Sequence, residues 1–170
     1  MAAMAVVSEV PEALRARLMP TNEVVGTFET RKRPGGTGAL LVTRGDFRIR
    51  PGADFAWRTR EPFETLFWTS RERYVYSNED ERVERPLADL PQASRFAALA
   101  AGDFSSALKA FEVRYGAEPG GRFRLAAKPK ARELKGRLET VDAEGDPTNL
   151  TVRAIFPDRT EFEVELRTRR

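Results

Sequence analysis

The sequence contains neither histidine nor cysteine, the two residue types that most often carry out chemistry in proteins. Without histidine there is no Ser-His-Asp triad, and the most common general base and metal ligand is missing. Without cysteine there are no disulfides, zinc fingers or thiol nucleophiles. These absences exclude the commonest catalytic classes, so we expect no enzymatic activity, no metal and no cofactor.

Carboxylates leave one route to catalysis open. Glu161, Glu163 and Glu165 alternate along one segment and therefore share a strand face, where acidic residues mostly serve solubility. Gly35-Gly36 and Gly120-Gly121 lack the lysine and the helix start of a phosphate-binding loop. A carboxylate-dependent enzyme is therefore the third of three hypotheses.

Aromatic residues are the most distinctive feature of the chain. The stretch FAWRTREPFETLFW, residues 55–68, places five large aromatics around a central Glu-Pro. Such residues can form a core, stack on nucleic-acid bases or line an apolar pocket. A tight turn at the Glu-Pro pairs Trp57 with Leu66. It also pairs Phe55 with Trp68, which predicts one apolar and one polar face for this hairpin.

The charge balance favours a nucleic-acid or polyanion partner only weakly. The chain has 29 basic and 26 acidic residues, a net charge of +3 and a calculated pI of about 9.5. The two signs are interleaved, as in Arg58-Thr59-Arg60-Glu61, instead of forming a basic stripe. A polyanion-binding module is therefore the second hypothesis, and we expect no nucleic-acid partner.

The sequence pattern predicts mostly β-strands. An N-terminal helix is expected from Ser8 to Met19, and two central helices are expected from Asp89 to Gly102 and from Asp103 to Phe111. Pro-Gly-Gly segments at 34–36 and 119–121 are typical of turns. The expected strands are 23–31, 38–50, 55–60, 64–70, 73–77, 82–86, 111–116, 122–128, 134–142, 149–156 and 160–167.

These elements predict an α+β fold in a single domain over residues 1–170. The fold is an incomplete, half-open antiparallel β-barrel of ten to eleven strands, because so long a sheet curls, and helices cover its apolar mouth. No stretch approaches the ~18 apolar residues of a membrane helix.

Several segments in order resemble the LolA-type lipoprotein carriers. They are VVGTFETR, GDFRIRPGADFAW, TREPFETLFWTS, RERYVYS and GGRFRLAAKPK. The resemblance implies a half-barrel with a helical lid and no catalysis. It implies a monomeric periplasmic shuttle that takes acylated lipoprotein or lipid cargo from an inner-membrane transporter to an outer-membrane acceptor. The N-terminus, MAAMAVVSEV, has no intact secretory signal, which is compatible with a mature form and equally with a cloning scar at this end.

The resemblance also implies site residues. Arg50, which precedes Pro51 one residue out of the family's register, would latch the lid. This departure suggests a divergent branch, so the alternative is a lipid-binding component of another envelope lipid or polyene export system. The expected lipid-binding residues are Phe28, Phe55, Trp57, Leu66 and Trp68 on the wall, and Phe96 and Leu99 on the lid.

Overall fold

The structure is a computed structural model of the 170-residue chain, and it describes residues 3–9, 11, 12, 15, 21–51, 54–89 and 105–169, with the backbone alone at 106 and 107. The strands are β1 (Ala5–Val6), β2 (Val24–Arg33), β3 (Leu41–Arg50), β4 (Asp54–Glu61), β5 (Thr65–Thr69), β6 (Arg73–Ser77), β7 (Arg82–Pro86), β8 (Phe111–Glu118), β9 (Arg122–Pro129), β10 (Thr140–Gly145), β11 (Asn149–Ile155) and β12 (Glu161–Thr168). The helices are α3 (Ser105–Ala110), α4 (Arg132–Lys135) and the short 3-10 helices η1 (Pro34–Gly36), η2 (Leu87–Asp89) and η3 (Pro119–Gly121).

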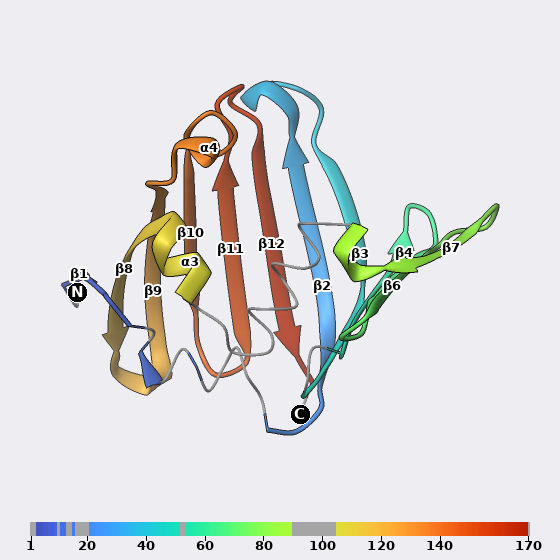
Figure 1. Cartoon of the computed structure of the whole chain (residues 1–170), viewed down its shortest axis with the longest axis horizontal. Coiled ribbons are helices and arrows are strands. Elements are labelled where there is room, and N and C mark those ends of the chain that lie inside the picture. The colour runs from blue at the N-terminus through green and yellow to red at the C-terminus, as the bar shows by residue number, and fades with distance from the viewer. Residues whose placement is uncertain are drawn as a thin grey trace. The chain divides into compact units, whose positions relative to one another are not determined.

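In the described part of the chain, twelve strands form one antiparallel sheet that does not close on itself. Its order is β1-β8-β9-β10-β11-β12-β2-β3-β4-β5-β6-β7, so β1 and β7 are its edges (Figure 1). The open antiparallel sheet expected from the sequence is confirmed, with twelve strands instead of ten to eleven. The predicted lid residues Phe96 and Leu99 lie outside the described residues.

The chain divides into two compact units. Unit 1 contains Met1–Glu9, Phe28–Val42 and Ser105–Thr168. Unit 2 contains Val10–Thr27, Thr43–Phe104 and Arg169–Arg170. The single domain expected over residues 1–170 stays a prediction.

Side chains alternate regularly across the strands of unit 1. Val152 of β11 lies opposite Ala143 of β10 and Val164 of β12, and Ala143 lies opposite Leu125 of β9. One residue further along β11, Arg153 has an acidic residue opposite it on each neighbouring strand. Because successive side chains point to opposite sides of a sheet, unit 1 has one apolar and one charged face. The apolar face consists of Val113, Tyr115, Phe123, Leu125, Ala127, Val141, Ala143, Leu150, Val152, Ala154, Phe162, Val164 and Leu166.

Both Pro-Gly-Gly segments form the turns that the sequence predicts. They fold as η1, before β3, and as η3, between β8 and β9. Gly35 and Gly36 have φ of 61° and 73°, a region that only glycine enters readily. A close approach explains a third glycine. A Cβ on Gly145 would stand 2.9 Å from the Phe123 ring and 2.7 Å from the Asn149 carbonyl oxygen.

We therefore expect Gly145→Ala to destabilise the protein by about 1–3 kcal/mol, because the added methyl overfills a packed site. Gly136→Ala is the matched control, since nothing lies within 4 Å of a Cβ placed there and its φ is −93°. Chemical denaturation of both variants checks the difference. Equal stability of the two variants would contradict the packing described for Phe123.

Unit 2 contains a meander of β3, β4, β5, β6 and β7, each antiparallel to the next. The hairpin predicted around Glu61-Pro62 is present, but its predicted register is wrong. Trp57 pairs with Phe67, and Arg58 pairs with Leu66. An odd number of residues separates the last paired positions, Thr59 and Thr65, whereas a two-residue turn would leave an even number.

This slip of one residue moves half of the predicted wall to the other side of the sheet. Phe55 and Trp57 share a face with Phe67, while Leu66 and Trp68 lie on the opposite face with Arg58. The expectation that all four predicted hairpin residues line one wall is therefore wrong. The aromatic face of unit 2 consists of Phe47, Ile49, Phe55, Trp57, Phe67, Tyr74, Tyr76 and Val83.

The predicted helices are only partly tested. Of the helix expected from Ser8 to Met19, the described residues Glu12 and Arg15 are helical. The helix expected from Asp89 to Gly102 lies outside the described residues beyond η2. The helix expected from Asp103 to Phe111 corresponds to α3, which ends at Ala110. Phe111 is the first residue of β8 and not the last residue of the helix.

Candidate functional site

The apolar face of unit 1 is a candidate binding surface because the chain covers it only partly. Phe123 and Ala127 are buried, and Tyr115 stacks on Phe123 with ring centroids 6.1 Å apart. The other members of the face are half-buried. A contiguous apolar surface left in this state marks a place where another apolar molecule can bind.

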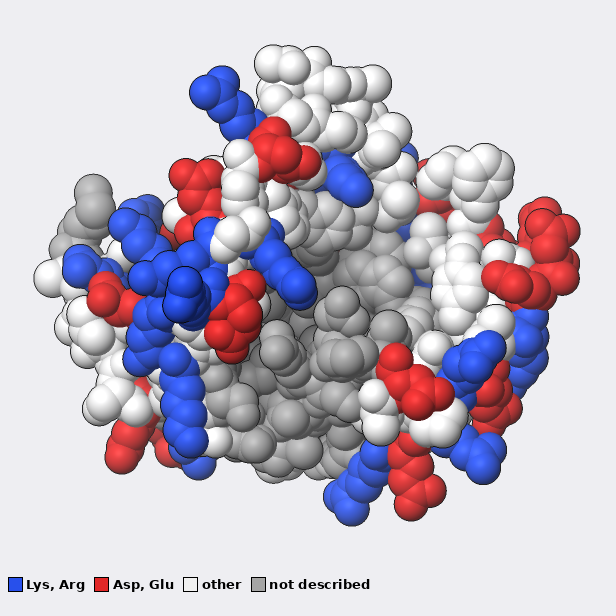
Figure 2. Space-filling view, turned by 45° about the horizontal axis from the view of Figure 1, so that its top comes forward, with Lys and Arg blue, Asp and Glu red and all other residues white. Residues whose placement is uncertain are grey.

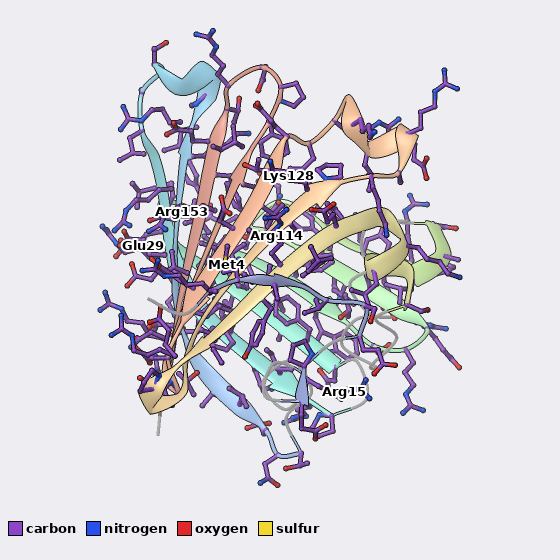
Figure 3. The ribbon with its side chains drawn as sticks, turned by 90° about the vertical axis from the view of Figure 1, so that its left-hand side faces the viewer. Met4, Arg15, Glu29, Arg114, Lys128 and Arg153 are labelled. Carbon is purple, nitrogen blue, oxygen red and sulfur yellow. The ribbon has the colours of Figure 1, made fainter. Side chains whose placement is uncertain are left out.

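The opposite face of unit 1 is charged and internally neutralised. Glu163 of β12 accepts a hydrogen bond from Arg31 at 2.8 Å and another from Arg153 at 2.6 Å. Arg153 also contacts Glu144 at 3.2 Å. Figure 3 labels Arg153 and Arg114, which the strand register places on this same face.

The pKa of Glu163 reflects this arrangement. Burial opposes its ionisation, but the hydrogen bonds from Arg153 and Arg31 outweigh burial and hold the pKa below its ordinary value. Glu165 is likewise paired, with Arg167 at 2.7 Å. Two of the three glutamates singled out in the sequence, Glu163 and Glu165, therefore form ion pairs on the charged face.

Opposite charges are mixed over the surface as well. In the space-filling view, Lys and Arg side chains lie beside Asp and Glu side chains on both sides of the picture (Figure 2). This agrees with the interleaving in the sequence. The described residues hold no group of three or more metal-ligating side chains close enough to bind a metal ion. Among those residues, no helix is both long enough and apolar enough to cross a membrane.

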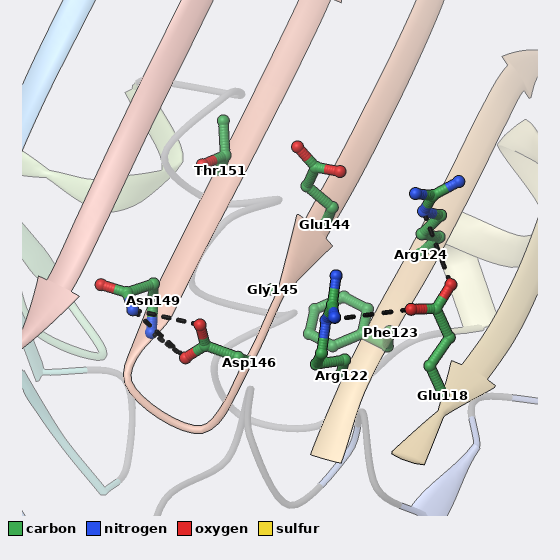
Figure 4. A pocket seen from close by; sticks show the side chains of 9 residues that line it. All are labelled: Glu118, Arg122, Phe123, Arg124, Glu144, Gly145, Asp146, Asn149 and Thr151. Atoms are coloured by element: carbon green, nitrogen blue, oxygen red, sulfur yellow. Dashed lines mark hydrogen bonds and ion pairs between the residues drawn. The ribbon is translucent and has the colours of Figure 1, made fainter. Parts of the chain in front are cut away.

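A polar hollow of about 260 Å³ lies at the end of unit 1 where β10 turns into β11 (Figure 4). At the rim of the hollow, the carboxylate of Glu118 lies 3.8 Å from Nε of Arg122 and 3.7 Å from Nε of Arg124. Asp146 accepts hydrogen bonds from the backbone N–H groups of Thr148, at 2.8 Å, and Asn149, at 3.0 Å. These hydrogen bonds stabilise the turn between β10 and β11. Asp146 therefore has a structural role in this hollow.

The same bonds hold the pKa of Asp146 well below its ordinary value. The folded pKa lies below the unfolded pKa of about 3.9. The stabilisation from this carboxylate is therefore present above about pH 4 and is lost as the pH falls towards the folded pKa. We expect Asp146→Asn to be less stable than the wild type at pH 7, and the difference to shrink by pH 2.5. Urea unfolding at several pH values measures it, and a difference independent of pH would contradict the assignment.

The aromatic face of unit 2 is the second candidate surface. Phe55 and Trp57 stack with ring centroids 5.8 Å apart, and Phe67 and Tyr74 lie 6.2 Å apart. Phe47 is buried, while the other members of this face are half-buried. The predicted wall residues Phe55 and Trp57 thus do lie together on a partly covered aromatic surface.

The other predicted site residues have different surroundings. Leu66 and Trp68 line a groove of about 530 Å³ on the opposite face of unit 2. Phe28 is buried in β2, with 3% of its surface exposed. Arg50 is exposed at the end of β3 and donates a hydrogen bond to Glu23 at 2.5 Å. Its role as a latch stays a prediction, since Phe96 and Leu99 lie outside the described residues.

Most of the apolar face of unit 1 was missed as a site by sequence reasoning. The alternation of β12 was evident, and similar alternation in β8 and β11 could have extended the surface. The groove of Leu66 and Trp68 is also lined by Arg48, Arg58, Arg60 and Arg169. These arginines were missed because only the pairing of β3 with β4 and the position of the chain end bring them together.

Comparison with solved structures gives several likenesses, of which two are described here. A LolA superfamily protein from Nitrosomonas europaea is similar over 94% of this chain and 91% of its own, with 8% identity and a TM-score of 0.48. A DUF1329 family protein from Desulfovibrio piger is similar over 92% and 90%, with 11% identity and a TM-score of 0.45. No family model and no curated protein matches the chain.

The first of these likenesses is to a protein of the superfamily that the sequence segments resemble. At these identities and TM-scores, neither likeness assigns a function. The functional argument therefore rests on the side chains.

Proposed function

We propose that the protein is a carrier that binds the acyl chains of lipids or lipoproteins against its apolar sheet faces, without catalysis. The observation that carries the proposal is the apolar face of unit 1, where eleven of its thirteen side chains are half-buried although they form continuous rows across β8 to β12. The partly covered aromatic face of unit 2 supports it.

Acyl chains suit such surfaces energetically. Each buried CH₂ contributes ~0.8 kcal/mol, so a chain of about sixteen carbons gains on the order of 12 kcal/mol before the costs of ordering it. A carrier must also release its cargo. Side chains that are already half-buried gain less on binding than fully exposed ones would, and this keeps the complex reversible.

The resemblance of FAW and the following hairpin to LolA-type carriers motivates the finer part of the proposal. In this scheme the protein works as a monomer in the periplasm. It receives acylated cargo from an inner-membrane transporter and delivers it to an outer-membrane acceptor. A cargo from another envelope lipid or polyene export system is the alternative, and lipids extracted from the protein purified from its own cell envelope would distinguish the two by mass spectrometry.

A charge placed on the apolar face should abolish acyl binding. We expect Leu125→Glu to weaken binding of a fluorescent fatty acid by at least about tenfold, because a carboxylate resists burial against hydrocarbon. Ala126→Glu is the matched control, since Ala126 is the next residue of β9 and faces the charged side, opposite Arg114 and Asp142. Phe55→Glu makes the same change in unit 2. Equal binding of the fatty acid by Leu125→Glu and Ala126→Glu would contradict the assignment of acyl binding to the apolar face of unit 1.

The two tryptophans provide a second test, because they lie on opposite faces of one hairpin. The uncharged methyl ester of a fatty acid, brominated along its chain, quenches a tryptophan that it touches. We expect quenching of Trp57 in a Trp68→Phe variant, and little quenching of Trp68 in a Trp57→Phe variant. The reverse pattern would place the acyl chain on the wrong side of unit 2.

A further inference from the structure

The groove on the opposite face of unit 2 has a composition that acyl binding does not explain. It has a volume of about 530 Å³, and its apolar lining comes from Val25, Phe47, Ala56, Leu66 and Trp68. Four arginines and a single aspartate also line it: Arg48, Arg58, Arg60, Arg169 and Asp46. An apolar floor with an arginine rim fits a molecule that is both anionic and partly apolar.

Asp46 occupies only part of the capacity of these arginines. One of its oxygens pairs with Nε of Arg60, and the other lies 2.8 Å from Nη2 of Arg169. A guanidinium has five N–H donors, so each arginine keeps donors for a further acceptor. Arg58 is paired outside this set, with Glu64 at 2.7 Å, and both side chains are about half exposed. Ion pairs of this exposed kind are weak and exchange readily with a stronger anion.

Arg48 is the least satisfied of the four. Its Nε is buried and has no hydrogen-bond partner within the part of the chain that the structure describes. The nearest carboxylate contact of Arg48 is Nη2 to Oδ1 of Asp54 at 3.9 Å, too long for a hydrogen bond. That same oxygen accepts a hydrogen bond from the Trp68 indole N–H at 2.8 Å. A buried donor without a partner carries a desolvation cost, which a rotation of the guanidinium towards an acceptor in the groove would relieve.

We propose that this groove binds a phosphate group, with Arg48 and Arg58 as its main donors and Leu66 and Trp68 as the floor. Arginine pairs with phosphate through two parallel hydrogen bonds, a geometry that a cluster of guanidinium groups provides from several directions. The phosphate belongs either to a lipid headgroup, whose first carbons then cover the floor, or to free phosphate. Apart from Phe47, which contributes to both, this site lies on the opposite side of the β4–β5 hairpin from Trp57 and is distinct from the acyl-binding surface proposed above.

The test uses the full chain carrying Trp57→Phe, so that Trp68 alone reports on the groove. Three probes are titrated at low ionic strength and followed by fluorescence and calorimetry: inorganic phosphate, dihexanoylphosphatidic acid and uncharged dihexanoylglycerol. We expect both phosphate-bearing probes to change the Trp68 emission and dihexanoylglycerol to leave it unchanged. Tighter binding of the phosphatidic acid identifies a lipid headgroup as the ligand, and equal binding identifies free phosphate.

Matched variants test the named arginines. Arg58→Gln and Arg48→Gln should each weaken phosphate binding by about tenfold, the effect of losing a charge-assisted hydrogen bond. Arg73→Gln should change it less than about twofold, because Arg73 is also exposed and paired with one glutamate, at 3.0 Å, but does not line the groove. Arg48→Gln is checked for folding by circular dichroism, and Arg58, being exposed, gives a second variant.

Two results would overturn the proposal. One is the absence of any Trp68 response to either phosphate-bearing probe at millimolar concentration. The other is an equal loss of binding in Arg58→Gln and Arg73→Gln, which would indicate general charge attraction. Neither result affects quenching of Trp57 by the uncharged brominated ester, so failure of this site and failure of the carrier function are distinguishable.

Discussion

The alternation of side chains across antiparallel ladders is the constraint on which the rest of the structure depends. Every paired strand must send one residue to each side in turn, and the register decides which side. In unit 1 this separates hydrocarbon from ion pairs so completely that Val152 and Arg153, neighbours in sequence, lie in different environments. A wall of this kind can present an apolar surface to a guest while its other side remains compatible with water.

Burial in the described residues follows the same logic. The buried hydrophobic side chains there are Phe28, Phe47, Val75, Leu87, Phe123 and Ala127. Each large one contributes about 1.5–3 kcal/mol relative to the exposed state. Much of the remaining apolar area lies on half-buried faces, which contribute to stability and still keep surface for another molecule. The sheet thus combines a small packed centre with broad, partly covered surfaces.

The sequence allowed much of the fold to be predicted, because a two-residue period and Pro-Gly-Gly turns are visible without coordinates. It could not fix the register of the β4–β5 hairpin, which depends on how many residues the turn uses. For that reason Leu66 and Trp68 were placed on the wrong side. A two-residue strand such as β1 has no period to detect, and α4 interrupts a segment expected to be a strand. The groove arginines come together only through pairing of β3 with β4 and through the chain end.

The edge strand β7 has a consequence for how such a protein behaves at high concentration. A sheet edge exposes unpaired backbone groups that can recruit a second copy, and apolar surfaces nearby would strengthen that association. The sequence of β7, Arg-Val-Glu-Arg-Pro, sets charged side chains along the edge and ends on a residue with no backbone N–H to donate. These residues oppose growth into fibres, so a chain with exposed hydrocarbon surfaces can stay dispersed in a crowded compartment.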